Sequence, residues 1–345
     1  MGELYGVYKN FGNKKVEQFR KDAYHLYHGE MFRIGDCNPS GLILKKFADH
    51  FNLDTEQRIW MALLYSTCYC VPTTFVIFYH FPNYPLVIIK QDRDDFLGHV
   101  QEWWNLKKPD LMFQSDRRYV KNMNWFVPIL KSYMENMGEN QYETLSKLKS
   151  KKADETFNNV YNFIVKNWKY YGRFSAFLFT ETLSALIDNF DMNPTWIDWK
   201  QGSTATEGLC HYLNRDDLVE KYKYKGLSTS DYKYLDKEFE KLLQRFHQIF
   251  GEKPQVWDVE TSLCGYRKLF KGTRYLGYYI DRQLEELYKV LNTNPDLNDV
   301  WDLVFKWREE CFDSDYLGEI HGWKSIRKQF CKQFLEKGVI FIENG

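Results

Sequence analysis

The chain has 345 residues, and its 47 Lys and Arg residues balance 47 Asp and Glu residues, so that the formal net charge at pH 7 is zero. This length allows one large domain or two ordinary domains with hydrophobic cores that need no disulfides. Zero net charge excludes a simple polycation that coats nucleic acid, although a local basic groove stays compatible with it.

Aromatic residues make up 18% of the chain, and seven residues are Cys. We expect the aromatic side chains to fill an irregular helical core, with a surface for base stacking as the alternative. The closest Cys pair, Cys68 and Cys70, does not have the C-x-x-C spacing of zinc ligands. The sequence therefore predicts no disulfide framework and no metal site.

The amino-terminal residues are polar and lack the apolar run of a signal peptide. The longest apolar stretches, near Phe75–Phe81 and Leu86–Ile89, are too short to span a bilayer. We therefore expect a protein of the reducing cytoplasm with no membrane partner.

Apolar residues recur at helical spacing along most of the chain, starting with residues 13–28. The D-x-x-Q pattern at Asp54–Gln57 predicts a helix start, and the following run Arg58–Cys70 is expected to be buried. A structural salt bridge is the expected role of Arg58, and an anion contact is the alternative. The β-branched segment Thr73–Tyr79 would also suit a strand, but its helical surroundings favour a helix.

Two basic features follow in the first half of the chain. The pair Arg117–Arg118 is flanked by aromatic residues, and adjacent arginines are usually exposed. The run Lys147–Lys152 is expected to be a solvated loop, with a contact to the phosphate backbone of DNA as the alternative. This run marks the expected boundary between an amino-terminal lobe, residues 1–150, and a carboxyl-terminal lobe, residues 151–345, unless the chain forms one continuous domain.

Strand signals are scarce, so the sequence predicts an all-α, irregular multi-helix fold. Besides those above, helices are expected over Gly41–Phe51, Asp92–Leu106, Ala153–Trp168, Phe174–Asn189, Leu227–Phe250, Val256–Phe270, Gly277–Leu291, Asn298–Cys311 and Gly322–Lys337. The chain has no G-x-x-x-x-G-K-[ST] and no G-x-G-x-x-G motif, so no nucleotide cofactor is predicted. The absence of H-E-x-x-H, G-x-S-x-G and paired C-x-x-C motifs argues against zinc hydrolases, α/β-hydrolases and zinc deaminases.

A polar stripe follows the apolar helix predicted over Phe174–Asn189. At 100° per residue, Arg173, Thr180, Glu181, Ser184 and Asp188 fall within about one quadrant of its circumference. The stripe suits a structural ion-pair network or an exposed edge. It also suits a pocket in which Arg173 binds an anion and Glu181 or Asp188 acts as a base.

A turn made of Gly202, Ser203 and Thr204 precedes the next helix. Thr204 and Glu207 have the spacing of a capping box. Gly202 and the free N–H groups of the helix start would alternatively hold a phosphate. Further along, Glu260, Cys264 and Arg267 share one helix face.

The series YYGRFSAFLFTETL and QGSTATEGLCHYL, the segment Trp60–Pro72 and the segment Leu263–Phe270 together resemble the phage-associated α-glutamyl/putrescinyl thymine pyrophosphorylase family, also called amino acid:DNA transferases. The resemblance implies a helical fold related to DNA glycosylases and, for a phage-encoded chain, a place in the host cytoplasm. It implies an enzyme that acts on double-stranded DNA whose thymines carry a pyrophosphorylated hydroxymethyl group. An amino acid or a polyamine then displaces pyrophosphate from the 5-methylene carbon. The absence of the motifs named above predicts that no cofactor and no metal takes part.

The residue types are compatible with this chemistry. The leaving pyrophosphate would be held by cations and N–H donors, and a carboxylate, Glu181 or Asp188, would take the proton of the amine. The candidates for holding substrate and phosphate are Arg173, Tyr171, Gly172, Gly202, Ser203, Thr204, Arg267 and Arg58, with Tyr170 and Phe174 next to an extruded base. Addition of Cys264 or Cys210 to C6 of the pyrimidine is a further option. A glycosylase-like enzyme and a non-catalytic DNA-binding or scaffold protein stay open as alternatives.

Overall fold

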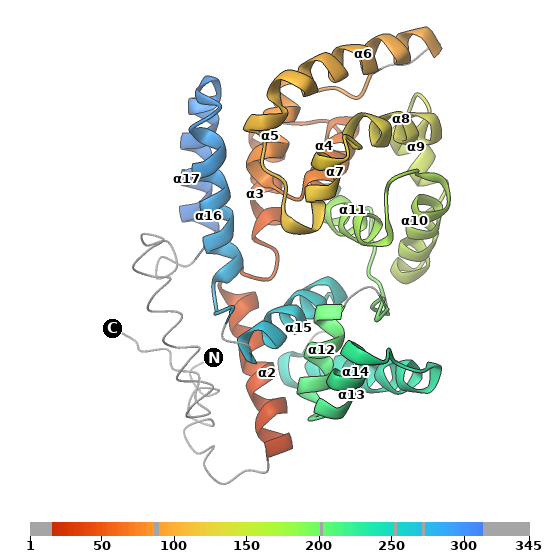
Figure 1. Ribbon diagram of the computed structural model, residues 1–345, viewed down its shortest axis with the longest axis vertical. Helices are drawn as coiled ribbons and strands as arrows, with labels where there is room; N and C mark the ends of the chain where they lie inside the picture. The colour runs from red at the N-terminus through yellow and green to blue at the C-terminus, as the bar shows by residue number, and fades with distance from the viewer. Residues whose placement is uncertain (1–15, 86–89, 201–202, 252–253, 271–272, 313–345) are drawn as a thin grey trace. The chain divides into compact units, whose positions relative to one another are not determined.

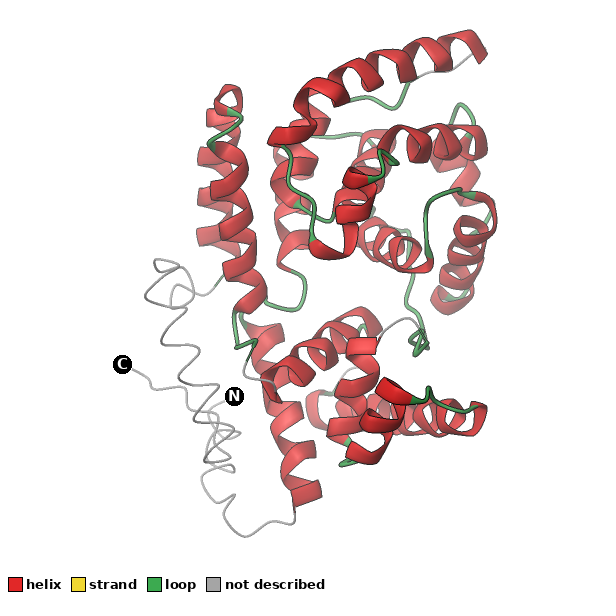
Figure 2. Cartoon of the chain, viewed as in Figure 1, coloured by secondary structure: helices red, strands yellow, loops and turns green. Residues whose placement is uncertain are grey.

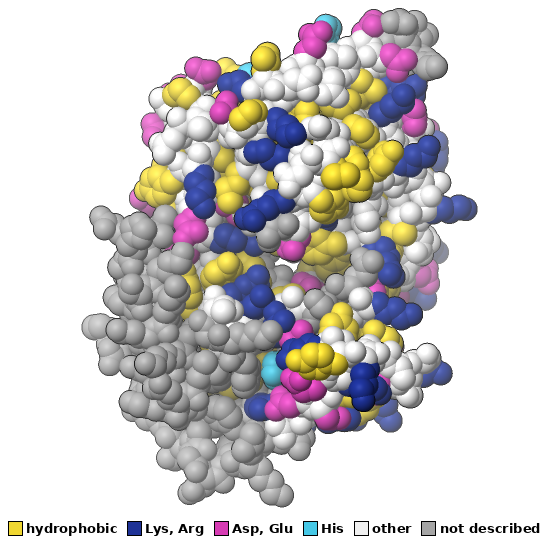
Figure 3. Space-filling model, in the orientation of Figure 1, with side chains coloured by type: hydrophobic (Ala, Val, Ile, Leu, Met, Phe, Trp, Pro, Cys, Tyr) yellow, Lys and Arg dark blue, Asp and Glu magenta, His cyan; other side chains and the backbone are white. Residues whose placement is uncertain are grey.

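The computed structural model describes residues 16–85, 90–200, 203–251, 254–270 and 273–312. Every regular element in these ranges is a helix (Figure 2), and the prediction of an all-α chain is confirmed. None of the described helices combines the length and apolar character needed to cross a membrane. On the face shown in Figure 3, Lys and Arg alternate with Asp, Glu and hydrophobic side chains, as the neutral composition leads one to expect.

The chain divides into two units that interleave along the sequence (Figure 1). Unit 1 holds residues 1–38, 195–281 and 312–345, and unit 2 holds residues 39–194 and 282–311. The boundary expected at residue 150 falls inside unit 2, so lobes with the bounds 1–150 and 151–345 stay a prediction.

The helices of unit 1 are α2 (Val16–Arg33), α12 (Ser203–Tyr212), α13 (Asp216–Tyr224), α14 (Thr229–Phe250) and α15 (Val256–Phe270). Those of unit 2 are α3 (Pro39–His50), α4 (Thr55–Cys68), α5 (Val71–His80), α6 (Lys90–Lys107), α7 (Arg118–Asn122), α8 (Phe126–Met137), α9 (Gln141–Ser146), α10 (Ala153–Asn167), α11 (Arg173–Leu186) and α17 (Asn298–Cys311). The division between the units falls inside α16 (Tyr278–Leu291). Short 3-10 turns cover Lys108–Asp110, Ser115–Arg117 and Pro295–Leu297.

Local sequence signals account for many helix bounds. Asp54 caps α4, since its side chain accepts from the N–H of Gln57 at 2.9 Å and the Gln57 side chain accepts in return, which confirms the predicted capping box. The ambiguous segment Thr73–Tyr79 is helical, within α5, as expected. The helix predicted over Gly322–Lys337 lies outside the described residues.

The helix predicted over Phe174–Asn189 is wrong at its carboxyl end. Helix α11 ends at Leu186, Ile187 has an extended backbone, and Asn189 is left-handed with φ 66°. Asn tolerates this conformation, which reverses the chain where the hydrophobic periodicity still favours a helix. Asp188 therefore lies beyond the helix and is not part of its polar stripe.

The core of unit 1 is built on the close crossing of α12 and α15. A Cβ atom at Gly208 would lie 2.1 Å from the carbonyl oxygen of Leu263, so only glycine allows the two backbones to approach this closely. Helix α2 packs beside them, where the Tyr24 hydroxyl lies 2.7 Å from Ser262 Oγ. The buried carboxylate of Asp36 accepts from the N–H groups of Gly277, Tyr279 and Ile280 and so caps the amino end of α16.

The core of unit 2 is organised by α4 and α11, which pack antiparallel. At one end the Ser66 hydroxyl bonds the Tyr171 hydroxyl. At the other end Arg58 Nη1 donates to the carbonyl oxygen of Leu186 at 3.1 Å, an acceptor that the helix end leaves free. This pairing brings the amino end of α11 next to the carboxyl end of α4.

We expect Gly208→Ala to lower the free energy of unfolding by about 3 kcal/mol, because the added methyl group would overlap a backbone oxygen that cannot rotate away. Urea unfolding followed by circular dichroism would measure this loss.

Gly98→Ala is the matched control, because Gly98 lies in the middle of α6 with no atom within 4 Å of its Cβ position. This substitution should be neutral or stabilise by about 0.5–1 kcal/mol through helix propensity. Equal effects of the two substitutions would contradict the account of the α12–α15 crossing.

Candidate functional site

The residues predicted for the site fall into both units. In unit 2, Gly172 is the N-cap of α11 and Arg173 is its first residue. Tyr171 is buried and bonds Ser66, while Arg173 and Glu181 are half-buried. Burial raises the pKa of the Tyr171 hydroxyl, so this group stays neutral.

Two other candidates in unit 2 have surroundings that favour structural roles. The Asp188 side chain is 87% exposed and lies 3.4 Å from Lys45 Nζ. All three guanidinium nitrogens of Arg58 are engaged, by the carbonyl oxygens of Leu53 and Leu186 and by Asp49 Oδ1 at 2.8 Å. The expected salt bridge of Arg58 is confirmed.

In unit 1, the predicted capping box at Thr204 and Glu207 is wrong in its register. Helix α12 already includes Ser203, so Thr204 is its second residue and not its cap. Both carboxylate oxygens of Glu207 are instead bound by Arg267, at 2.8 and 3.0 Å, in a buried ion pair between α12 and α15. Gly202 and the Ser203 side chain lie outside the described residues.

The two cysteines considered as nucleophiles are also in unit 1. Burial raises the pKa of the Cys210 thiol to about 12 and that of Cys264 well above its ordinary value. Cys264 donates to Glu260 Oε1 at 3.1 Å. Because the thiolate is the reactive form, both surroundings disfavour covalent catalysis.

A polar cluster of unit 2 surrounds the turn between α4 and α5, which we call the Tyr69 turn (residues 68–70). Tyr69 ends α4 in the left-handed region, with φ 54°, an uncommon conformation for a bulky residue. Its N–H still donates to the carbonyl oxygen of Tyr65 at 2.6 Å. The turn directs the Tyr69 ring out of the helix and starts α5 directly after Cys70.

The Tyr69 ring lies in a row with two arginines and a second ring. The Arg282 guanidinium of α16 lies over Tyr69 at 5.0 Å, and the Phe174 ring meets Tyr69 edge-on at 5.7 Å. On the other side, the Arg117 guanidinium lies over Phe174 at 4.7 Å. We call this row Arg282–Tyr69–Phe174–Arg117 the cation–ring row. Phe174 is 38% exposed, so the row reaches the surface.

Glu286 of α16 lies next to one end of the row. Its Oε1 is 3.1 Å from Arg282 Nε, and its carboxyl also takes hydrogen bonds from the Gln114 amide and the Cys70 thiol. The residue is 2% exposed. Burial raises the pKa of Glu286 to about 7, although Arg282 acts in the opposite direction. This carboxyl therefore changes its charge close to neutral pH.

The charge of Glu181 acts on Tyr65, a tyrosine that precedes the Tyr69 turn on α4. Burial is the main cause of the raised pKa of Tyr65, the Glu181 carboxylate raises it further, and the Arg282 guanidinium lowers it. Glu181 and Arg282 thus act on one buried hydroxyl, and Tyr65 itself contacts the Tyr69 ring at 5.8 Å. The carboxylate predicted on α11 and one end of the cation–ring row thus share an electrostatic effect on Tyr65.

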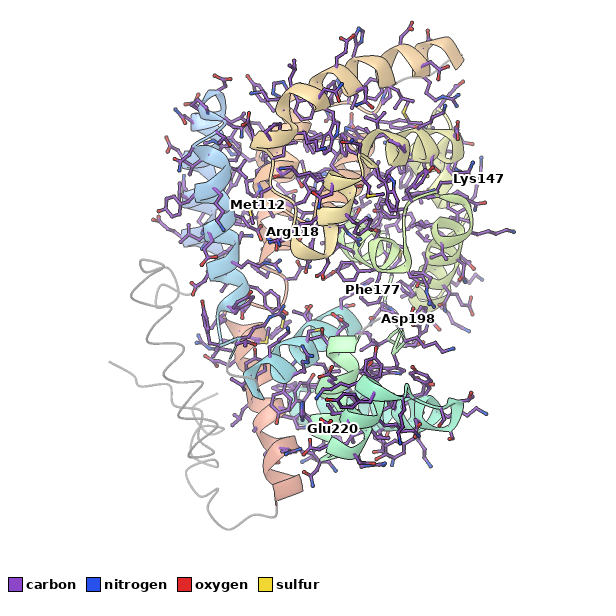
Figure 4. The ribbon with its side chains drawn as sticks, viewed as in Figure 1. Met112, Arg118, Lys147, Phe177, Asp198 and Glu220 are labelled. Carbon is purple, nitrogen blue, oxygen red and sulfur yellow. The ribbon has the colours of Figure 1, made fainter. Side chains whose placement is uncertain are left out.

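Arg117 and Glu286 belong to this cluster, but neither is among the site residues predicted from the sequence. The paired arginines differ, because Arg118 is exposed at the start of α7 (Figure 4) while Arg117 is 2% exposed. The aromatic residues that flank this pair in the sequence were the signal that could have revealed the burial of Arg117. Withdrawing a guanidinium from water costs several kcal/mol, and a desolvated cation–ring contact returns about 2 kcal/mol. The free-energy cost of burying the Arg117 guanidinium is therefore not offset by its contact with the Phe174 ring alone.

The raised pKa of Glu286 makes the stability of the protein depend on pH. The folded-state pKa of about 7 lies above the ordinary value of 4.5, so the folded protein binds the extra proton between these values. The contribution of this group to the free energy of unfolding is thus present below about pH 4.5 and is lost as the pH rises through about 7. Glu286→Gln should remove this loss.

Urea unfolding at a series of pH values would test this dependence. The free energy of unfolding of the variant minus that of the wild type should increase from about pH 5 to about pH 8 by on the order of 3 kcal/mol. Glu285→Gln, at the adjacent position of α16, is the control. A difference for Glu286→Gln that stays constant over this range would show that burial does not raise the pKa of this carboxyl.

Comparison with known proteins places the chain in a family. Residues 36–275 match the family described as amino acid:DNA transferase. A protein of Salmonella phage ViI named serinyltransferase is 29% identical over 304 residues, which cover 82% of this chain and 71% of the relative. No solved structure gives a significant match. Because the family match covers well over half of the sequence, the chain belongs to the amino acid:DNA transferase family.

Proposed function

We propose that this protein transfers an amino acid to a modified thymine of double-stranded DNA, with release of pyrophosphate. In the proposed step, the amine nitrogen attacks the 5-methylene carbon of 5-pyrophosphoryloxymethyluracil, and a new C–N bond forms. The C–O bond to pyrophosphate breaks, the leaving group keeps the electron pair, and the amine gives up one proton. Family membership supports DNA and an amino acid as substrates. The name of the phage relative makes serine the first amine to test.

The observation that carries this proposal is the buried carboxyl of Glu286 at the end of the cation–ring row. A general base works best when its pKa is near the working pH, and burial raises the pKa of Glu286 to about 7. Its contact with Arg282, at 3.1 Å, fixes the carboxyl at one end of the row. Glu286 is therefore our first candidate for the group that takes the proton of the amine.

Exposed aromatic rings beside the row suit a base that has left the DNA stack. Extrusion of a base costs a few kcal/mol and is repaid in part by stacking on side chains. Phe174 is 38% exposed and Tyr170 is 50% exposed, and Tyr170 contacts Trp125 at 5.2 Å. We propose that these rings receive the modified thymine.

Some of the residues singled out in the sequence keep proposed roles in this reaction, and others do not. Arg173 would contact the leaving pyrophosphate. Glu181 is the second candidate base, because it is half-buried on α11 and its charge acts on the same tyrosine as Arg282. Asp188 is a weaker candidate, since its side chain is 87% exposed beyond the end of α11 and pairs with Lys45. Glu207 occupies the Nε and Nη2 atoms of Arg267, and all three guanidinium nitrogens of Arg58 donate within the protein, so neither keeps a proposed role.

Mass spectrometry of nucleosides after incubation of the protein with pyrophosphorylated DNA and serine tests the proposal. We expect an aminated thymidine and one pyrophosphate for each adduct. Abasic sites in place of the adduct would point to glycosylase chemistry. Binding of the DNA without any product would point to a non-catalytic role.

Paired variants test which carboxylate takes the proton. Glu286→Gln should lower the transfer rate by about 100- to 10,000-fold, the usual contribution of a general base, while Glu285→Gln should have little effect. Glu181→Gln serves as the competing variant, and its rate is measured on the same modified duplex. A large loss with Glu181→Gln and none with Glu286→Gln would transfer the role to Glu181.

A further inference from the structure

One edge of the Arg117 guanidinium has no hydrogen-bond partner among the described residues, whereas the same edge of Arg267 and of Arg215 binds a carboxylate. The Nε and Nη2 atoms form the edge that binds two oxygens side by side. In Arg267 this edge is filled by Glu207, at 2.8 and 3.0 Å, and in Arg215 it is filled by Asp217, at 2.7 Å for both bonds. In Arg117, Nε and Nη2 are buried, and neither has a hydrogen-bond partner in the described part of the chain.

The remaining contacts of Arg117 fix the guanidinium without using this edge. Nη1 donates to the Tyr119 hydroxyl at 2.6 Å and to the carbonyl oxygen of Asp116 at 3.3 Å. The Phe174 and Tyr119 rings lie against the guanidinium, at 4.7 and 5.7 Å. The side chain is therefore held in one orientation with two donors to spare.

The Phe174 ring that lies against this guanidinium belongs to the second residue of α11, so one side chain separates Arg117 from the amino end of this helix. Its first turn has no acidic residue, the N-cap Gly172 offers no side-chain hydrogen bond, and Arg173 adds a positive charge. Helix amino ends carry a partial positive charge and N–H donors that suit phosphate. Two independent features, the unfilled edge of Arg117 and the uncapped end of α11, thus favour the same ligand.

We propose that the Nε and Nη2 atoms of Arg117 and the amino end of α11 bind the oxygens of a phosphate group carried by the DNA substrate. The inference rests on the proposed function and deepens it. The phosphate group is either the pyrophosphate that leaves the modified thymine or a phosphate of the DNA backbone. A planar, bidentate donor suits either source, since both present two oxygens on one phosphorus.

The test uses the full-length protein and two probes, inorganic pyrophosphate in isothermal titration calorimetry and an unmodified DNA duplex in fluorescence anisotropy. Arg117→Met keeps the apolar stem and removes the donors, and Arg118→Met is the matched control at the exposed neighbour. For the true source, Arg117→Met should weaken binding about 10- to 100-fold, as expected for loss of charge-assisted bonds. Arg118→Met should change it by less than about threefold.

The pattern of losses identifies the source of the phosphate. A loss confined to pyrophosphate points to the leaving group, a loss confined to the duplex points to the backbone, and a loss for both points to a site that accepts either. Unchanged affinity of Arg117→Met for both probes would overturn the inference. An equal loss with Arg118→Met would also overturn it, because the effect would then follow from local charge.

Arg117→Lys keeps the inference testable if Arg117→Met does not fold. Lysine retains the charge but lacks the planar pair of donors, so the same probe should bind more weakly than it does to the wild type. Where pyrophosphate is the source, saturating pyrophosphate should raise the melting temperature of the wild type, and this rise should shrink in Arg117→Lys; where the backbone is the source, the duplex takes its place in the same measurement. Since both readouts measure binding, the phosphate site would stand even if no aminated thymidine formed, and only the proposed function would fall.

Discussion

The left-handed backbone of Tyr69 is the constraint on which unit 2 depends. It ends α4 and allows α5 to begin directly after Cys70. It also turns the Tyr69 ring between Phe174 and Arg282. A bulky residue adopts this conformation only where its surroundings hold it there, and such positions concentrate at functional sites. The packing of α4 against α11 and the contacts to α16 provide those surroundings.

The turn gathers groups whose burial has an energetic cost. Glu286 is uncharged at low pH and becomes charged near neutrality within a dry cluster. Arg117 is charged and has two donors that no described residue accepts from. Proteins seldom retain such groups for stability, because an apolar replacement is often neutral or stabilising. The proposed displacement of pyrophosphate by an amine would use both a carboxyl that takes a proton and a cation that binds an anion.

Local sequence patterns predicted the helices, whereas the candidate site depends on side chains that residues distant in sequence bury. The capping box at Asp54 and the periodicity of Val256–Phe270 involve neighbours in sequence, so both were predictable. The buried state of Arg117 depends on Phe174 and Tyr119, and that of Glu286 depends on Gln114 and Cys70, so no local pattern reveals either. Resemblance identified the family, but the errors at Asp188 and Thr204 arose where a helix ended or began a few residues from its expected bound.

The ratio of the wild-type transfer rate to that of Glu286→Gln, followed from about pH 5.5 to about pH 8.5, tests the central claim most directly. Because the protonation of the amine affects both rates equally, it cancels in the ratio. The pH dependence that remains is that of the enzyme's base. The account predicts a ratio that rises about tenfold per pH unit below about pH 7 and levels off above it. A ratio that stays constant across this range would contradict the account.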